Sequence, residues 1–434
     1  MASGRGGPFP ENFLHPLEAF LSFFKVYYNM IRIFRPGKGT AHSVSRFRAM
    51  TFIVSAFMLL LFPTVSAANE GSPLPPNVQK CVTALLAMRK ADAPLPDKAL
   101  FEEFLSYTTS AVNLTAPGEK PPAPAKLGKA SGILWRARLQ APLATTLEYL
   151  YNPKVPTEVV YPASVRYARW QAGSDILTLQ TPLWKQFGQH TDTPLVLRGT
   201  EREEITPDTN SSAYYSYTLD RVLILTEHKG RQMLISLAWQ KDKSDVGKKA
   251  AVIGDYSNWD FVYSGVKGTL AKGIGWAETF IYASTSISIF YEDAPGGNGT
   301  GYAMYRWMDA GWSGMNMVKG HHMKDGAERS FKGLKAFLES PKRPAASAIA
   351  AHTAALEKMD VAALREVFKP YSVKVEEAAA TVEALKTEDF QKVIQNAGYG
   401  DSLSKNELIA ALNVNYIKEQ LGKPLLAGPL TAKP

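Results

Sequence analysis

Cysteine is nearly absent from this 434-residue chain, which contains only Cys81. A single cysteine cannot form an intramolecular disulfide, and it excludes every metal motif that is built from several cysteines. Cys81 shares a helical apolar pattern with Val78, Val82 and Leu85, so we expect a small buried hydrophobe at this position. A nucleophilic role would need a histidine or cationic neighbour that the sequence does not identify.

Histidine is scarce as well, with seven in the chain and five in residues 68–434. His321 and His322 are adjacent, so on a helix their side chains would point ~100° apart and could not chelate together as an i, i+4 pair does. The sequence has no His-Glu-x-x-His pattern and no Walker motif, and no Gly-x-Gly-x-x-Gly opens a helix after a strand. We therefore expect no metal site, no nucleotide and no cofactor.

A strong positive charge is missing from most of the chain. The net charge is +9, but residues 1–67 carry seven Lys/Arg and two acidic residues, which leaves +4 for residues 68–434. A nucleic-acid-binding domain usually has a clustered basic surface, and a weakly basic body with interspersed signs argues against one. We expect no nucleic-acid partner, and the sequence does not identify a protein partner.

An apolar run without charges covers the eleven residues 52–62. It is too short to span a bilayer but suits the hydrophobic part of a signal peptide, and Arg46 and Arg48 precede it. Val65-Ser-Ala67 supplies the small residues that a signal peptidase reads. The sequence therefore predicts an exported protein, periplasmic or secreted, with cleavage near Ala67.

The alternative for this segment is a short anchor helix. The true start could be Met30 or Met50, because either would shorten the unusually long basic region before the apolar run. Contact with a membrane is then expected only transiently or through an uncleaved N-terminus.

Composition and periodicity divide the chain into six segments. Helical spacing, proline clusters and alternating strand patterns change at their boundaries. Asp97 is a predicted helix N-cap, and Ser404 with Glu407 forms a predicted capping box. The segments are an export signal region (1–67), a helical hairpin (68–116), a proline-rich linker (117–127), an antiparallel α+β core domain (128–341), a helical region (345–421) and a loose tail (422–434).

The core domain begins with a strand at 133–139 and a short helix at 142–150. It ends with two strands at 277–291 and 302–308 and a long amphipathic helix at 319–339. Between them lie short runs rich in Tyr, Trp, Thr and Val, separated by polar turns, which are typical of an antiparallel sheet. These runs are 165–170, 176–179, 194–201, 214–226, 233–239, 251–253 and 261–266.

This order of elements resembles the START-like, helix-grip superfamily of proteins that bind lipids and other hydrophobic ligands. The residues that carry the resemblance are the 142–153 unit after the first strand, the 287–291 and 302–308 strands, and the 319–339 helix. The resemblance covers residues 128–341 and implies a curved antiparallel sheet that grips a long C-terminal helix around an apolar cavity. The helix or the 309–318 loop would gate that cavity.

Aromatic side chains are concentrated near the end of the core domain. They could line a ligand pocket, because such pockets are mostly apolar with a few polar groups, or they could be ordinary sheet core. The predicted ligand-binding residues are Trp276, Glu278, Phe280, Tyr282, Tyr291, Tyr305, Trp307 and Trp312.

The favoured interpretation is thus a protein that binds a lipid or other hydrophobic small molecule, rather than an enzyme. One alternative is a cell-envelope hydrolase that uses buried carboxylates such as Glu278 or Asp255. Another is a structural or interaction module without a cavity. Gly311-Trp-Ser-Gly314 is one residue short of the Gly-x-Ser-x-Gly turn of serine hydrolases, so we expect a structural turn there.

Overall fold

The computed structural model describes residues 71–110, 121–190, 193–207, 211–271 and 275–426. The predicted signal region, the first part of the linker and residues 427–434 lie outside these ranges. Residues 67–434 form a compact unit of their own. Within the described ranges, every helix is too short or too polar to cross a membrane.

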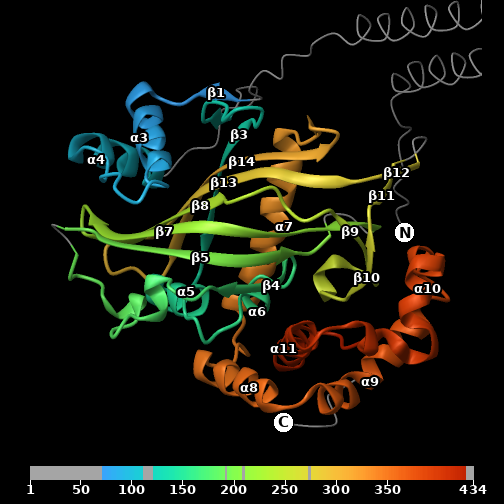
Figure 1. Cartoon of the computed structure of the whole chain (residues 1–434). Coiled ribbons are helices and arrows are strands. Elements are labelled where there is room, and N and C mark those ends of the chain that lie inside the picture. Colours follow the sequence, from blue (N-terminus) through green and yellow to red (C-terminus); the bar gives the residue numbers. More distant parts are fainter. Residues whose placement is uncertain (1–70, 111–120, 191–192, 208–210, 272–274, 427–434) are drawn as a thin grey trace, which may run out of the picture. The chain divides into compact units, whose positions relative to one another are not determined.

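A large antiparallel sheet forms the centre of the described unit (Figure 1). The strand of this sheet that comes first in the chain, Gly132–Leu139, pairs with the long strand that comes last, Thr300–Trp312. The beginning and the end of the sheet's sequence therefore lie side by side. The predicted α+β class with a large antiparallel sheet and a C-terminal helix is confirmed. The strands in spatial order are β3 (Gly132–Leu139), β14 (Thr300–Trp312), β13 (Thr279–Glu292), β8 (Arg231–Gln240), β7 (Ser216–His228), β5 (Leu195–Ile205) and β4 (Val165–Trp170), and β15 (Met315–Asn316) pairs with the end of β14.

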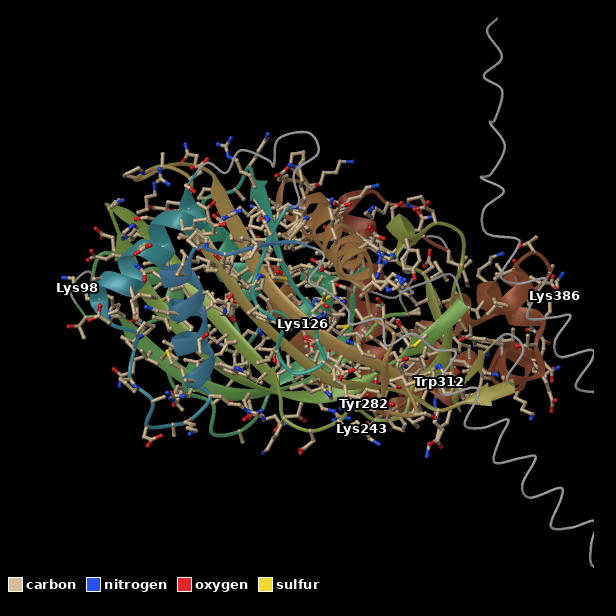
Figure 2. All side chains as sticks on the ribbon, turned by 90° about the horizontal axis from the view of Figure 1, so that it is seen from above. Lys98, Lys126, Lys243, Tyr282, Trp312 and Lys386 are labelled. Carbon is tan, nitrogen blue, oxygen red and sulfur yellow. The ribbon has the colours of Figure 1, made fainter. Side chains whose placement is uncertain are left out.

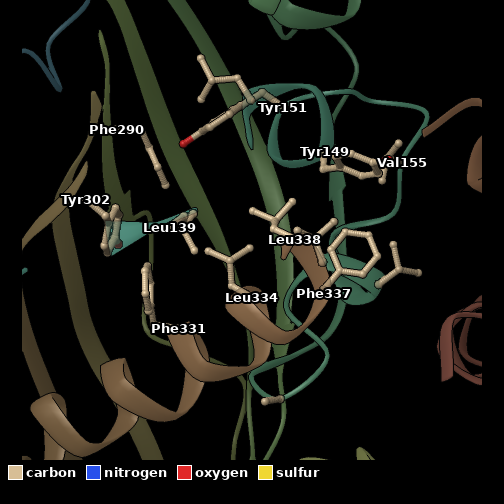
Figure 3. Packing of buried hydrophobic residues seen from close by; sticks show 14 of the residues in the cluster. Leu139, Tyr149, Tyr151, Val155, Phe290, Tyr302, Phe331, Leu334, Phe337 and Leu338 are labelled. Atoms are coloured by element: carbon tan, nitrogen blue, oxygen red, sulfur yellow. The ribbon is translucent and has the colours of Figure 1, made fainter. Parts of the chain in front are cut away.

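Three helices cover the inner face of this sheet. They are α5 (Leu143–Leu150), α6 (Thr157–Val160) and the long α7 (Gly320–Leu338). In Figure 3 Phe331 and Leu334 of α7 point toward Tyr302 and Leu139 on the sheet, and Phe337 lies beside Tyr149 of α5. The apolar spacing that predicted the 319–339 helix therefore marks the side of α7 that packs on the sheet.

Two helices cover the outer face. These are α3 (Pro76–Ala87) and α4 (Lys98–Thr109), and Asp97 caps α4 by accepting hydrogen bonds from the backbone of Ala99 and Leu100, as predicted. Cys81 is buried there, also as predicted. Its neighbours in this outer core include Phe104 from α4 and Ile287 from β13.

The C-terminal helices pack on a smaller sheet of β6 (Ser211–Tyr214), β9 (Lys248–Val252) and β10 (Phe261–Lys267). The predicted capping box of Ser404 and Glu407 is present at the start of the last helix. The helices are α8 (Ala346–Lys358), α9 (Val361–Ala378), α10 (Glu388–Ile394) and α11 (Lys405–Leu421). The remaining elements are β1 (Ser72–Pro73), β2 (Pro122–Ala123), β11 (Thr269–Ala271), β12 (Gly275–Ala277), η2 (Asp175–Leu177), η3 (Leu183–Lys185), η4 (Tyr256–Asn258), η5 (Glu383–Lys386) and η6 (Gln395–Ser402).

Three predicted elements differ from the structure. The 176–179 strand is instead the 3₁₀ turn η2, in which buried Ile176 supplied the apolar signal. The 214–226 strand is two strands, β6 and β7, that belong to different sheets. The 309–318 gating loop is mostly strand, because β14 continues to Trp312 and turns into β15 through Ser313 and Gly314 at φ values of 51° and 72°.

Candidate ligand-binding site

A cavity of about 650 Å³ lies between the inner face of the main sheet and α7. This volume is within the range of pockets that enclose one small molecule. Strands β5, β7, β8, β13 and β14 form its floor, and α7 forms its roof. The site therefore has the location that the sequence predicted for a cup and its covering helix.

Small side chains on the central strands create the space. Ser284, Ser286 and Ser288 of β13 line the cavity, and so do Ser236 and Ala238 of β8. The strand register places Ser286 opposite Ala238 and Ser288 opposite Ser236. Because adjacent residues of a strand point to opposite faces, the intervening isoleucines of β13 face the outer core instead. A helix packed above such a floor cannot fill it.

Aromatic side chains form one end of the cavity. Phe290 and Tyr302 are paired across β13 and β14, with ring centroids 4.7 Å apart. Phe331 of α7 stacks on Tyr302 at 5.8 Å, and Trp135 of β3 contacts Phe331 edge-on at 5.2 Å. We call these four residues the aromatic cluster. It offers an apolar surface to the cavity.

A buried group of charges lies on the other side of the floor. Arg221 of β7 donates to Glu201 of β5, with Nε 2.8 Å from Oε2. The neighbouring Glu203 accepts a hydrogen bond of 2.5 Å from Tyr217. Burial raises the pKa of Glu201, and the adjacent guanidinium of Arg221 opposes that rise. Both carboxylates are thus already engaged by neighbouring side chains.

Arg306 of β14 also lines the cavity, and its surroundings differ. Its Nε is buried and has no hydrogen-bond partner within the part of the chain that the structure describes. Ser286, which is small, stands directly opposite it on β13. The cavity wall therefore contains one guanidinium that a neighbouring carboxylate does not neutralise.

Cavity-lining residues in the first turns of α7 reach solvent. His322 and Asp325 both line the cavity and are exposed to solvent. His322 also caps the helix, because its Nδ1 accepts a hydrogen bond of 3.2 Å from the backbone of Lys319. The helix start that the sequence predicted near His321 and His322 therefore lies at the solvent-exposed edge of the cavity.

Three of the predicted ligand-binding residues lie on the opposite face of the sheet. Tyr305 and Trp307 are buried in the outer core, and Tyr291 packs against it. Tyr305 hydrogen-bonds Thr108 of α4 at 2.9 Å, and the Trp307 indole donates to the backbone of Ala125 at 2.8 Å. The prediction chose the wrong face for these three residues, because their aromatic character suits a solid core equally well.

Three others lie at the end of the sheet where β13 begins and β14 ends. Tyr282 and Trp312 are labelled there in Figure 2, and Thr279 pairs with Trp312. Phe280 lies beneath the ammonium of Lys243, which is 3.8 Å from the ring centroid. The Tyr282 hydroxyl accepts a hydrogen bond from the backbone of Gly314. These three residues shape a hairpin end and are not among those that line the cavity.

The last two predicted residues are Glu278, which is not among the residues that line the cavity, and Trp276. Glu278 is exposed, and the side chain of Trp276 is outside the described atoms. Asp255 is exposed too, and its side chain caps η4 through Ser257, whose hydrogen bonds lower the pKa of Asp255. The two carboxylates of the hydrolase alternative are therefore not buried.

Searches for related proteins give no further identification. Within the described residues, no three His, Cys, Asp or Glu side chains are placed to hold a metal ion. No protein-family model matches the chain, and no curated protein matches it. The cavity and its lining are therefore the basis for any functional assignment.

Proposed function

We propose that this protein binds a hydrophobic or amphipathic small molecule, such as a lipid, in the cavity between the main sheet and α7. The observation that carries the proposal is the floor of serine and alanine side chains beneath a helix that cannot fill it. A protein core normally packs without large voids, so an unfilled space of this volume is unusual. A bound molecule would fill it.

The topology supports the START-like resemblance as part of this proposal. The first core strand, β3, pairs with the last long strand, β14. In the chain, α5 and α6 come between β3 and β4. The long helix α7 follows the last strands and lies over the cavity. This is the arrangement that a sheet gripping a C-terminal helix requires.

Uptake would be driven by burial of apolar surface. Each Å² of apolar ligand surface removed from water contributes about 25 cal/mol. The aromatic cluster supplies a matching apolar wall, and the exposed rim at His322 and Asp325 supplies a route from solvent. If the predicted signal is cleaved near Ala67, the binder acts in the periplasm or outside the cell.

A pair of substitutions on β13 tests the proposal. Ser286→Phe places a large side chain in the cavity, whereas Ala283→Phe adds the same bulk at an exposed position of the same strand. We expect wild type and Ala283→Phe to take up a fluorescent lipid saturably, and Ser286→Phe to lose at least ten-fold in affinity. Mass spectrometry of extracts from the purified protein should find a bound apolar molecule. No saturable uptake by wild type and no extracted molecule would contradict the proposal.

A further inference from the structure

Arg306 is the feature of the cavity that the proposed function does not yet explain. Arg306 is half-buried, and its buried Nε has lost its contact with water without gaining a hydrogen-bond partner, which is unfavourable. Two other arginines of this sheet that line cavities have carboxylate partners: Arg221 pairs with Glu201, and Arg166 pairs with Glu204. Arg306 makes no ion pair with the residues that the structure describes, and its buried Nε is without a hydrogen-bond acceptor there.

On the β13 side, the cross-strand neighbours of Arg306 are small and uncharged. Its cross-strand neighbour on β13 is Ser286, and the next residue in that row is Ala238 on β8. Glu203 of β5 lines the same cavity and accepts a hydrogen bond from Tyr217, on which the charge of Arg306 also acts, but Arg306 forms no ion pair with any described carboxylate of β5. Small side chains beside Arg306 leave room for a group that approaches its guanidinium.

The charge at this position favours a carboxylate as that group. A guanidinium presents paired N–H donors that match the two oxygens of a carboxylate. One guanidinium balances one negative charge, whereas a phosphate monoester carries nearly two at neutral pH. The second arginine of the floor, Arg221, is already held by Glu201 at 2.7 Å. A carboxylate therefore matches the single charge and the paired donors of Arg306.

The arrangement along β14 gives the ligand a direction. Along β14, Met304 lies between Arg306 and Tyr302, which belongs to the aromatic cluster. Tyr302 is four residues from Arg306, or ~13 Å at 3.3 Å per residue. On the other side of Arg306 along β14, Met308 also lines the cavity, and the lining residue His322 of α7 is exposed to solvent. A chain whose head is at Arg306 would thus have its apolar part against the aromatic cluster, away from solvent.

We infer that the ligand is a long-chain carboxylate whose head group is bound by Arg306 and whose tail lies against the aromatic cluster. This inference rests on the proposed function and names the chemical class that the same cavity accepts. The head group supplies the counter-charge that Arg306 lacks, and the tail fills the space above the serine floor.

The test compares a long-chain carboxylate with its neutral ester in the full chain. The probes are cis-parinaric acid and its methyl ester, whose fluorescence rises in an apolar site, titrated into wild type, Arg306→Met and Arg306→Gln. Arg202→Met is the matched control, because Arg202 is a partly exposed arginine of β5 that pairs with Asp245. It removes the same charge from the protein without touching the cavity lining.

Wild type should bind the acid at least ten-fold more tightly than the ester. Arg306→Met and Arg306→Gln should remove that preference and leave ester affinity unchanged, and Arg202→Met should behave as wild type. Equal binding of acid and ester by wild type would overturn the inference while leaving the proposed function intact, and this comparison needs no variant to fold. If neither probe binds saturably, the proposed function fails as well.

Discussion

Lys418 and Asp260 form a buried ion pair in which Lys418 Nζ lies 2.6 Å from Asp260 Oδ1. The pair joins α11 to the segment just before β10, and the Tyr371 hydroxyl of α9 donates to the same oxygen at 3.3 Å. The Lys418 side chain is completely buried. These contacts fix the C-terminal helices on the small sheet.

Removing one partner should be costly. Lys418→Met leaves the carboxylate of Asp260 buried without its cation, so we expect the free energy of unfolding to fall by about 3–5 kcal/mol. The double variant Lys418→Met/Asp260→Asn removes both charges and should regain part of that loss. Urea denaturation followed by circular dichroism measures both. An unchanged midpoint for the single variant would show that the ion pair contributes nothing.

Arg166 should not be replaceable by lysine. Its guanidinium lies 3.8 Å from the centroid of Tyr263 and pairs with Glu204 and with Glu407, the latter on α11. Lysine cannot stack in this way or bridge two carboxylates with a planar group. We expect Arg166→Lys to speed hydrogen exchange in α11 and to lower stability by about 2 kcal/mol or more. Exchange in α11 equal to that of wild type would contradict this role.

Neighbouring residues of β13 should respond in opposite ways. Ile287 is fully buried in the outer core, so Ile287→Ala should lower the free energy of unfolding by about 2–5 kcal/mol without changing ligand affinity. Ser286→Phe should do the reverse, with lost affinity and a smaller change in stability. Thermal denaturation and lipid titration of both variants measure these effects. A loss of affinity in Ile287→Ala at a temperature where it is folded would argue against two separate faces.

The thiol of Cys81 should be unreactive in the folded protein. Burial raises its pKa to about 12, whereas an unfolded cysteine titrates near ~8.5, and only the thiolate reacts with disulfide reagents. At pH 8 we expect labelling of native protein to be slow and labelling in urea to be fast. Rapid labelling of the native protein would mean that the outer core opens readily.

The same shift predicts a pH dependence of stability. Between roughly pH 8.5 and pH 12 the native thiol keeps a proton that the unfolded thiol has lost, so ν_U is smaller than ν_N and stability falls as pH rises. The contribution is complete below the unfolded pKa. Cys81→Ala should remove this part of the alkaline loss, which urea titrations between pH 8 and pH 11 can detect. An identical alkaline slope in Cys81→Ala would contradict it.

Periodicity predicted the main elements because they bury one regular face. The helix at 319–339 and the strand at 133–139 each carry a clear apolar pattern, and both are present within a few residues. The position of the cavity could be predicted from their order. Its lining could not, because the prediction followed large aromatic residues, which bury well on either face of a sheet.

The missed signal lies in the alternation of residues 284–289, Ser-Thr-Ser-Ile-Ser-Ile. Polar residues at every second position of a strand normally face water. Here α7 lies over the face that carries Ser284, Ser286 and Ser288, so the small polar side chains line the cavity instead. Only the tertiary position of α7 distinguishes these two readings. Arg306 was missed for the same reason, since an arginine on a strand is usually solvated.

The outer layer of α3 and α4 determines which wall of the cavity can move. Because Tyr305, Trp307 and Ile287 are packed beneath those helices, the sheet has a solid core behind it and cannot bend outward to widen the floor. The first turns of α7 are less enclosed, because His322 and Asp325, which line the cavity there, are exposed to solvent. Exchange of the proposed ligand would then displace one helix against a rigid support, and its rate would depend on how firmly the first half of α7 is held.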